Sequence, residues 1–525
     1  MSLEPVLGVD LGTTNSCVAV VLNGSVHVIP DETGDSIQAS VVSFLEDGSV
    51  LVGNQARQES VVDPVNSVVS AKRLIGRSFD SEQIRSIRRS MPYRVVKGRQ
   101  QESFVEIRGQ KFALPEVSGM VLRRMKDIAE AYVGQPIRKA VITVPANFND
   151  TQRQMTKLAG ELAGIDVIRV INEPTAAALA YGYGDDVNAR IAIYDFGGGT
   201  FDITLLDVRK NVFEVVSTAG DSFLGGDDFD DRLARYMIAA FKKQHDVALD
   251  DDPFVWGRLK HVAEKTKREL TETDKAIVMV HELAQDEAGA PLDLRFQLDR
   301  KGFGERCKDI VQRTFLICDE ALRNARLTVQ DLDEVVLVGG STRMPLVREM
   351  VKQYFGREVL AEVNPDEVVA IGAAIQGAAL VQDHLVEGNT GAHALLLDVA
   401  PQSLGIQSVS EIFEVLIERN AQIPCERTQV FTTTKDNQES VSIRIFQGES
   451  RIVAENTRLG EIELYGLRPA PRGQIQIEVT FEIDANGLVV VTARDLETGR
   501  AQAAHVRVSA GYDPDDIDAM RARSS

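Results

Sequence analysis

Residues 6–14 read VLGVDLGTT, and residues 191–200 read IAIYDFGGGT. Each stretch is an apolar run that ends in an aspartate and continues into a glycine- and threonine-rich turn. A second apolar run follows each turn, at 17–22 and at 201–208. The order of strand, tight turn and returning strand therefore occurs twice. This repetition predicts two similar α/β halves that face each other across a cleft, as in a two-lobed enzyme that opens and closes.

The pattern changes along the chain. Two further apolar runs, at 140–145 and 335–340, each lead into a helical pattern. From 403 to 509, apolar and polar residues alternate, and turn signals such as DANG at 484–487 separate the alternating runs. Short alternating strands at this spacing predict a β-sandwich.

The chain therefore divides into four expected parts. These are an α/β domain (1–385), a linker (386–402), a β-sandwich domain (403–510) and a short helical tail (511–525). In the tail, Asp513 and Pro514 are typical of the cap and the first residue of a helix.

Composition narrows the class of protein. The 525 residues are 44% apolar and 26% charged, which is ordinary for globular domains. The net charge is −20, so we expect no nucleic-acid partner, because neutralising phosphates takes clustered Lys and Arg. The acidity favours solubility, and a surface that attracts basic partners is the alternative.

Cysteine usage and the apolar runs indicate a compartment. The four cysteines include no CxxC pair, so neither a disulfide scaffold nor a zinc site is expected, and a reducing cytoplasm is. The N-terminus lacks the basic start and apolar core of a signal peptide. The small apolar stretch 370–381 is too short to span a bilayer and contains Gln376, so it predicts a closely packed helix and no membrane partner.

The two glycine turns are suited to bind a phosphate chain. Glycine allows close backbone approach, and consecutive turn N–H groups form an anion-binding concavity. Asp10 and Asp195 each end the strand before a turn, which suits Mg²⁺, an ion usually held by one or two carboxylates plus phosphates. The chain has no G-x-x-x-x-G-K-[ST] run, so this is not a P-loop site.

Several motifs together resemble one family. DLGTTNS at 10–16, IYDFGGGTFD at 193–202 and VLVGGSTRMP at 336–345 are similar to three signatures of the seventy-kilodalton heat-shock proteins, the DnaK-type chaperones. AKRLIGR at 71–77 and INEPTAAALAYG at 171–182 match between them, and the bacterial members are the closer likeness. The resemblance implies an actin-like (ribonuclease-H-like) two-lobed ATPase domain, followed by an all-β sandwich domain that binds extended peptides, and a short helical tail.

The resemblance also implies roles in an ATP site. Lys72 and Glu173 would position the attacking water, and Thr200 would lie beside the γ-phosphate. Asp10, Asp195 and Asp202 would hold Mg²⁺, its waters and neighbouring K⁺, with Asp202 a possible proton acceptor. ATP or ADP would contact Gly12, Thr13, Thr14, Gly197, Gly198, Gly199 and Thr200 at the phosphates, and Glu264, Lys267, Arg268, Thr271, Gly339, Gly340, Ser341, Arg343 and Asp366 at the adenosine. The spacing of Glu264, Lys267 and Arg268 puts them on one helix face, which by itself is also typical of a solvated ion-pair pattern.

Other matched positions would couple the two activities. Leu395, Leu396, Leu397 and Asp398 match the interdomain linker, and the alternative is the first strand of the β-domain. Pro145 and Arg153 match a relay between nucleotide and linker, while Arg169, Asn172, Thr175 and Asp398 match positions that engage J-domain cochaperones. Asn147 stands where bacterial members have Tyr, which predicts an altered cochaperone response or allosteric timing.

The peptide site is implied in the β-domain. Its lining would be Ile406, Val409, Phe431, Thr434, Val441 and Ile443, and sandwich core is the alternative for the apolar members. Val409 and Thr434 replace Met and Ala of the bacterial likeness, so we expect an altered peptide preference. The family continues with a helical lid, of which this chain has only the first turns, so we expect fast peptide release.

The expected partners are unfolded or extended polypeptides, a J-domain cochaperone and a nucleotide-exchange factor. Two other functions were weighed. A small-molecule kinase on the same fold would have no use for the β-domain. A non-enzymatic scaffold would lack catalytic residues, yet Lys72, Glu173, Thr200 and Asp202 are all present.

Overall fold

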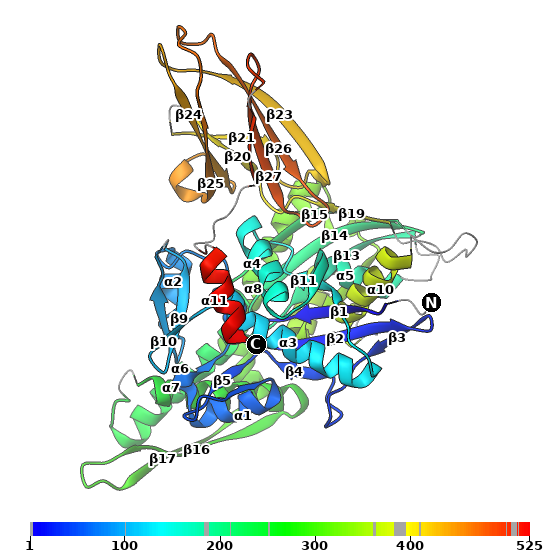
Figure 1. Cartoon of the computed structure of the whole chain (residues 1–525). Coiled ribbons are helices and arrows are strands. Elements are labelled where there is room, and N and C mark those ends of the chain that lie inside the picture. Colours follow the sequence, from blue (N-terminus) through cyan, green and yellow to red (C-terminus); the bar gives the residue numbers. More distant parts are fainter. Residues whose placement is uncertain are drawn as a thin grey trace.

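The structure is a computed structural model, and it describes residues 4–99, 101–182, 188–210, 212–249, 252–360, 364–382, 395–408, 411–499, 501–505, 512 and 514–524. The predicted peptide contact Val409 and the predicted helix cap Asp513 lie outside these residues, as do the expected domain boundaries near 385 and 510. Figure 1 shows two α/β parts, which we call lobe I and lobe II, with a β-domain above them.

Lobe I is built on a mixed sheet with the strand order β12-β11-β1-β2-β3, and β4 pairs with β2. The strands are β1 (Val6–Leu11), β2 (Asn15–Leu22), β3 (Ser25–Val28), β4 (Ile37–Ala39), β11 (Lys139–Val144) and β12 (Asp166–Asn172). β1 and β2 form the predicted hairpin, and β1 runs parallel to β11. Side chains alternate across β2, so Val18 and Val20 pack towards α3 (Leu114–Val133), while Cys17 and Ala19 pack against α10 (Val368–Gln382).

Smaller elements complete lobe I. They are β5 (Val42–Phe44), β6 (Val50–Val52), α1 (Asn54–Val62), β7 (Ser67–Val68), α2 (Glu82–Ile87), β8 (Arg94–Lys97), β9 (Ser103–Ile107), β10 (Gln110–Ala113) and α4 (Asp150–Leu162). The helix α10 covers the small apolar stretch, as its composition predicts. Among the described residues, no helix combines the length and the apolar character that crossing a bilayer requires.

Lobe II repeats the central arrangement of lobe I. Its strands include β13 (Asn188–Phe196), β14 (Phe201–Arg209), β15 (Val212–Asp221) and β18 (Glu334–Val338). β13 and β14 form the second predicted hairpin, and β13 runs parallel to β18, just as β1 runs parallel to β11. Further elements are α6 (Gly226–His245), α7 (Pro253–Glu272), the hairpin β16 (Lys275–Gln285) with β17 (Pro291–Asp299), α8 (Arg300–Ala325) and α9 (Pro345–Phe355). Helix α5 (Glu173–Gly182) packs with α10, in an apolar cluster that includes residues of both sheets.

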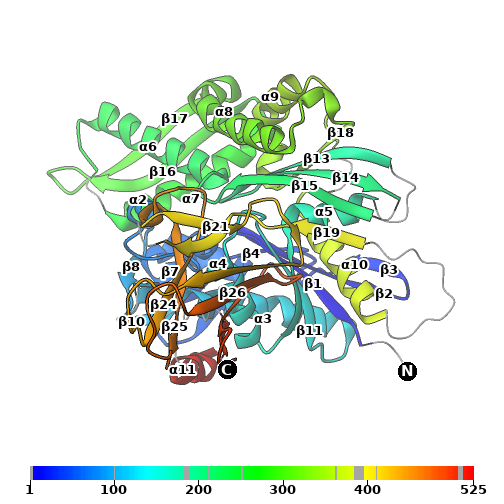
Figure 2. The same cartoon turned by 90° about the horizontal axis from the view of Figure 1, so that it is seen from above.

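The β-domain consists of two four-stranded sheets, ordered β21-β20-β24-β25 and β23-β26-β27-β28. The strands are β20 (Leu404–Gln407), β21 (Phe413–Ile417), β23 (Cys425–Thr432), β24 (Ser440–Gln447), β25 (Thr457–Tyr465), β26 (Gln476–Ile483), β27 (Val489–Asp495) and β28 (Ala501–His505). One apolar core draws buried residues from both sheets, which is the arrangement of a sandwich. Figure 2 shows this domain over the junction of the two lobes.

The described part of the predicted linker, 395–402, begins with a strand. β19 (Leu395–Val399) pairs in parallel with β15 of lobe II, and antiparallel with β22 (Gln422–Ile423) of the β-domain. It therefore extends the sheet of lobe II, rather than standing free as a hinge or joining a sandwich sheet. The physical reason is that the outer edge of β15 offers unpaired backbone groups, which an extended apolar segment satisfies.

The tail helix α11 (Pro514–Ser524) lies on lobe I, against α3 and α4 (Figure 1). Met520 is buried in the lobe I core, and the ring of Tyr512 packs edge-on against Phe104. Arg523 donates two hydrogen bonds, of 2.8 and 3.0 Å, to the fully buried carboxylate of Glu116. The tail thus covers lobe I in this arrangement.

Candidate nucleotide site and its connection to the β-domain

The two glycine turns touch each other across the lobes. A Cβ on Gly198 would lie 1.9 Å from Thr14 Oγ1, and a Cβ on Gly199 would lie 2.4 Å from Thr13 Cγ2. Only glycine permits this approach, because any side chain would collide with the facing threonine. The turns therefore form two walls of one cleft, as the repeated sequence pattern predicts.

Most of the predicted nucleotide residues line this cleft. Those that do are Asp10, Gly12, Thr13, Thr14, Lys72, Glu173, Asp195, Gly197, Gly198, Thr200, Glu264, Lys267, Arg268, Thr271, Gly339, Gly340, Ser341, Arg343 and Asp366. Gly199 and Asp202 are not in the lining, and Asp202 is buried behind it with only 1% of its surface exposed. Arg57 and Gly226 also line the cleft, and no motif in the sequence singled them out.

A buried ion pair lies at the centre of the site. Lys72 and Glu173 are 6% and 7% exposed, and the Lys72 ammonium donates to the Glu173 carboxylate and to the carbonyl of Leu11. Lys72 comes from the short helical turn 71–73, and Glu173 is the first residue of α5. Two separate elements of lobe I thus hold an amine and a carboxylate together, at a point where a water molecule could be positioned.

The surrounding carboxylates carry more negative charge than the protein neutralises. Burial, followed by the nearby Glu173 carboxylate, raises the pKa of Asp10 to about 7. Burial and the same carboxylate also raise the pKa of Asp195 and of Asp202 well above the usual range. One ammonium, that of Lys72, faces these acids, so the site favours a bound cation.

This donor set fits Mg²⁺ bound jointly with phosphates. Within the described stretches, no three His, Cys, Asp or Glu side chains converge closely enough to hold a metal ion alone. Mg²⁺ usually keeps several waters and takes one or two carboxylates plus phosphate oxygens. Asp10 and Asp195 can supply those two carboxylates, whereas Asp202 accepts a hydrogen bond of 3.2 Å from the backbone of Asn147.

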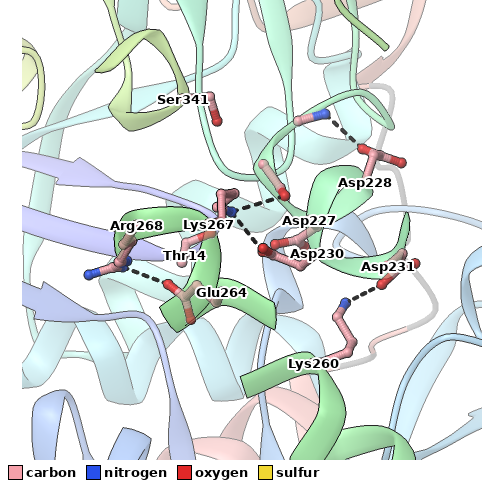
Figure 3. A network of polar contacts seen from close by, with 12 residues as sticks. Thr14, Asp227, Asp228, Asp230, Asp231, Lys260, Glu264, Lys267, Arg268 and Ser341 are labelled. Carbon is pink, nitrogen blue, oxygen red and sulfur yellow. Dashed lines mark hydrogen bonds and ion pairs between the residues drawn. The ribbon is translucent and has the colours of Figure 1, made fainter. Parts of the chain in front are cut away.

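The expected adenosine side is a set of paired charges on α7 (Figure 3). Arg268 donates to Glu264 Oε1 at 2.6 Å, and Arg57 of lobe I lies 3.8 Å from the same oxygen. Burial opposes ionisation of Glu264, but the two guanidinium groups outweigh it and lower its pKa to about 2. Lys267 donates to Asp230 at 2.8 Å, so it is held in place before any ligand binds.

The opposite side of the expected adenosine pocket is held by a second pair. Arg343 donates to Asp366 Oδ2 at 2.9 and 2.7 Å, which identifies the acidic partner that the sequence did not reveal. Ser341 Oγ donates to the carbonyl of Gly197 at 2.8 Å and so ties this loop to the phosphate turn. The Thr271 hydroxyl bonds back to the carbonyl of Lys267 within its own helix.

An acidic segment at the start of α6 connects lobe II to lobe I, and Figure 3 shows its side chains Asp227, Asp228, Asp230 and Asp231. Ser70 donates to Asp227 at 2.7 Å, and Arg73 donates to Asp228 at 2.7 Å and to the carbonyl of Gly199 at 3.0 Å. No motif in the sequence points to this network. Its signal is the acidic run 227–231, which by itself resembles an exposed helix start.

The sequence of the whole chain was compared with models of protein families. The family model described as "Hsp70 protein" matches residues 6–525. The chain belongs to the Hsp70 family. Hsp70 proteins are ATP-dependent chaperones that bind ATP or ADP with Mg²⁺ and work with peptide substrates and cochaperones. The mixed α/β part and the β-domain agree with the actin-like ATPase and peptide-binding parts of that family.

In this Hsp70, the predicted coupling residues meet at the linker strand. Asn172 Nδ2 donates to Asp398 at 2.8 Å, and Thr175 Oγ1 donates to the same oxygen at 3.3 Å. Arg153 donates to Asn172 Oδ1 at 2.6 Å. Burial raises the pKa of Asp398, although these donors and Arg153 oppose that shift.

The remaining coupling residues lie close by. Pro145 is buried in the loop after β11, and Arg169 is half-buried on β12 next to Val170, whose N–H donates to Asn486 Oδ1 of the β-domain at 3.1 Å. Asn172 and Thr175, which the resemblance assigns to cochaperone binding, are 3% and 0% exposed. In this arrangement they serve an internal contact.

The β-domain contacts both lobes through residues that the sequence analysis did not select. Asp150 accepts a hydrogen bond of 2.8 Å from the N–H of Val489. On lobe II, Arg419 donates to the carbonyl of Thr218 at 3.0 Å, and Asn420 accepts from the N–H of Thr218 at 3.2 Å. These are ordinary polar residues without a motif, and only the tertiary structure brings them together.

The predicted peptide residues divide into three groups. Ile406 and Ile443 are each 6% exposed and belong to the sandwich core, which was the alternative for them. Phe431 and Val441 pack against that core and are half-buried. Thr434 is exposed, in a loop where Gln438 accepts its backbone N–H at 3.1 Å.

Proposed function

We propose that this Hsp70 hydrolyses ATP in the cleft and thereby controls how its β-domain binds and releases extended apolar peptide segments. The observation that carries the proposal is a pair of neighbours in the sequence. Glu173 faces Lys72 in the cleft, and Asn172 hydrogen-bonds to Asp398 on the linker strand. Because Asn172 and Glu173 are adjacent in the chain, a movement of Glu173 in the cleft also moves the Asn172–Asp398 hydrogen bond.

Hydrolysis in this site rests on positioning. Lys72 and Glu173 orient the attacking water, Thr200 lies at the phosphate turn, and the N–H groups of both turns bind the phosphate chain. Mg²⁺, when bound at Asp10 and Asp195, supplies neutralisation of phosphate oxygens, and K⁺ beside it would add to this. Without a bound cation, the negative charge of the buried carboxylates Asp10 and Asp195 is not balanced, and Mg²⁺ bound with the nucleotide would balance it.

The arrangement seen here, with β19 on the edge of β15, corresponds in our proposal to the ATP-bound state. Release of that strand after hydrolysis would free the β-domain from both lobes. An extended peptide would then add its backbone to the β-domain and place an apolar side chain near Phe431 and Val441. Val409 and Thr434 would shape the preference for that side chain.

The partners follow from the same arrangement. Arg169 is half-buried, whereas Asn172 and Thr175 are buried, so we propose that a J-domain first binds at Arg169 and loosens the Asn172–Asp398 contact. A nucleotide-exchange factor would act on the lobe II rim of the cleft. Scarce, unpaired cysteines support a cytoplasmic location.

The test is the release of a fluorescent, leucine-rich peptide from the purified chain, followed by anisotropy with ATP and with ADP. We expect faster release with ATP. The matched control is Glu173→Gln, which keeps the shape of the site but should abolish hydrolysis. Equal rates with both nucleotides would refute coupling, and no binding at all would refute the peptide-binding role.

A further inference from the structure

Asn147 reaches from lobe I into lobe II. It lies in the loop between β11 and α4, and its side-chain Nδ2 donates to the carbonyl of Gly220 on β15 at 2.9 Å. Its backbone N–H donates to Asp202 Oδ1 on β14 at 3.2 Å. One residue of lobe I thus bonds two strands of lobe II.

The two acceptors are themselves partners. Asp202 and Gly220 face each other in the β14–β15 ladder. A Cβ on Gly220 would lie 2.1 Å from Asp202 Oδ1, so the carboxylate occupies the space that a side chain would fill. Asn147 consequently holds a cross-strand pair whose acidic member lies behind the cleft.

The loop that carries Asn147 is held from its other side by Arg153. The guanidinium donates to the carbonyls of Ala146 at 3.3 Å and Phe148 at 3.2 Å, which flank Asn147. It also donates to the carbonyl of Asn486 in the β-domain at 3.5 Å. The position of Asn147 therefore depends on a side chain that the docked β-domain contacts.

We propose that the Asn147 amide is an interlobe clasp, a positioning residue that holds Asp202 in place when the lobes close. The inference rests on the proposed ATPase function. Because the hydrogen bonds of Asn147 go to Gly220 and Asp202, neither of which lines the cleft, the clasp sets the rate of hydrolysis and not the affinity for ATP. The β-domain acts on it through Arg153, so docking and hydrolysis share this loop.

The experiment compares Asn147→Asp, Asn147→Ala and Asn147→Gln in the full chain. Aspartate has the shape of asparagine but offers no donor to the Gly220 carbonyl, alanine removes the donor without adding charge, and glutamine keeps an amide donor. We expect single-turnover hydrolysis to fall roughly tenfold in the Asp and Ala variants and less in the Gln variant, with the Kd for ATP within about threefold. Asn188→Ala, at an exposed strand start in lobe II, is the matched control.

Two results would overturn the clasp. One is wild-type hydrolysis by both the Asp and the Ala variants, and the other is a loss of ATP affinity as large as the loss of rate. Trp256, the one tryptophan of the chain, donates to the carbonyl of Ser90 across the lobes, so its fluorescence reports lobe closure and folding in every variant. A wild-type chain that shows neither an ATP-induced fluorescence change nor hydrolysis would refute the ATPase proposal itself, which separates the two failures.

Discussion

The nucleotide cleft and the contact surface of the β-domain both bury acids, but they differ in how those acids are compensated. At the cleft, the carboxylates of Asp10 and Asp195 in the lining, and of Asp202 buried behind it, lie near the ammonium of Lys72, and the pKa values of all three acids are raised. At the β-domain surface, amides, backbone groups and buried acids such as Asp150 satisfy one another. The first region therefore needs a ligand to balance its charge, whereas the acids of the second accept hydrogen bonds from within the protein. Single substitutions can adjust how tightly the β-domain docks on the lobes, because each hydrogen bond in this contact contributes little free energy.

The largest effect is expected from a substitution that disrupts the nucleotide cleft and leaves the β-domain contact intact. Lys72→Ala removes the buried ammonium that pairs with the Glu173 carboxylate. We expect ATP hydrolysis to fall about 100-fold or more, because a preorganised charge at the reacting centre is lost. Phosphate release in single turnover measures it. The exposed Lys210→Ala is the control, and hydrolysis that survives Lys72→Ala would remove the ion pair from the mechanism.

The second-largest effect is expected from a substitution that disrupts the β-domain contact and leaves the nucleotide cleft intact. Asp398→Ala leaves the buried amide of Asn172 and the hydroxyl of Thr175 without their acceptor. We expect the acceleration of peptide release by ATP to shrink about thirtyfold, since unsatisfied buried groups are costly. Anisotropy decay with ATP and ADP measures the acceleration. Asp80→Ala, at a partly exposed position of lobe I, should behave as the wild type, and an unchanged acceleration in Asp398→Ala would show that the linker strand does not transmit the signal.

A pH series sharpens the comparison. Burial at the β-domain contact raises the pKa of Asp150 to about 7, from an ordinary value near 3.8 in separated domains. The docked form therefore binds the proton more tightly, and docking weakens as the pH rises from about 4 to 7, then levels off. Hydrogen exchange of the β19 amides should be about tenfold faster at pH 8 than at pH 6, after correction for intrinsic exchange.

Asp150→Asn is the matched variant for that series, because it keeps the acceptor for the N–H of Val489 but cannot ionise. It should remove most of the dependence on pH. A dependence that persists in this variant would assign the titration to Asp398, whose pKa burial also raises.

The sequence predicted the cleft far better than the β-domain surface, and the reason is physical. Close approach of two turns demands glycine, and phosphate chemistry demands aspartate at strand ends, so the repeated motifs at 6–14 and 191–200 carry the site. Arg57, Asn420 and Asn486 belong to ordinary helices and turns, and only folding brings them to their partners. No local pattern distinguishes them from solvated polar residues.

The predicted peptide-binding residues show a second limit of prediction from sequence. Alternation with period two predicts a sandwich, but an apolar residue on the inner face looks the same whether it fills the core or lines a groove. Ile406 and Ile443 are therefore buried in the core here, although the resemblance assigns them to the peptide. The linker leucines were ambiguous in the same way, because an extended apolar segment pairs with whichever sheet edge is open.

The smallest effect tests the rim of the cleft, at a hydrogen bond between the two lobes. Trp256 Nε1 donates to the carbonyl of Ser90 at 2.7 Å, and the Arg235 guanidinium lies 5.3 Å from the Trp256 ring centroid. Trp256→Phe keeps an aromatic ring but loses one neutral hydrogen bond between the lobes, so ADP release should become only about threefold faster. Displacement of a fluorescent ADP analogue measures the rate, and exposed Phe254→Ala on the same helix is the control. Hydrolysis should stay at the wild-type rate, because the substitution leaves the Lys72–Glu173 pair unchanged. If Trp256→Phe instead lowered hydrolysis as much as Lys72→Ala does, the rim and the Lys72–Glu173 pair would act as one unit. The contrast between these two regions would then be refuted.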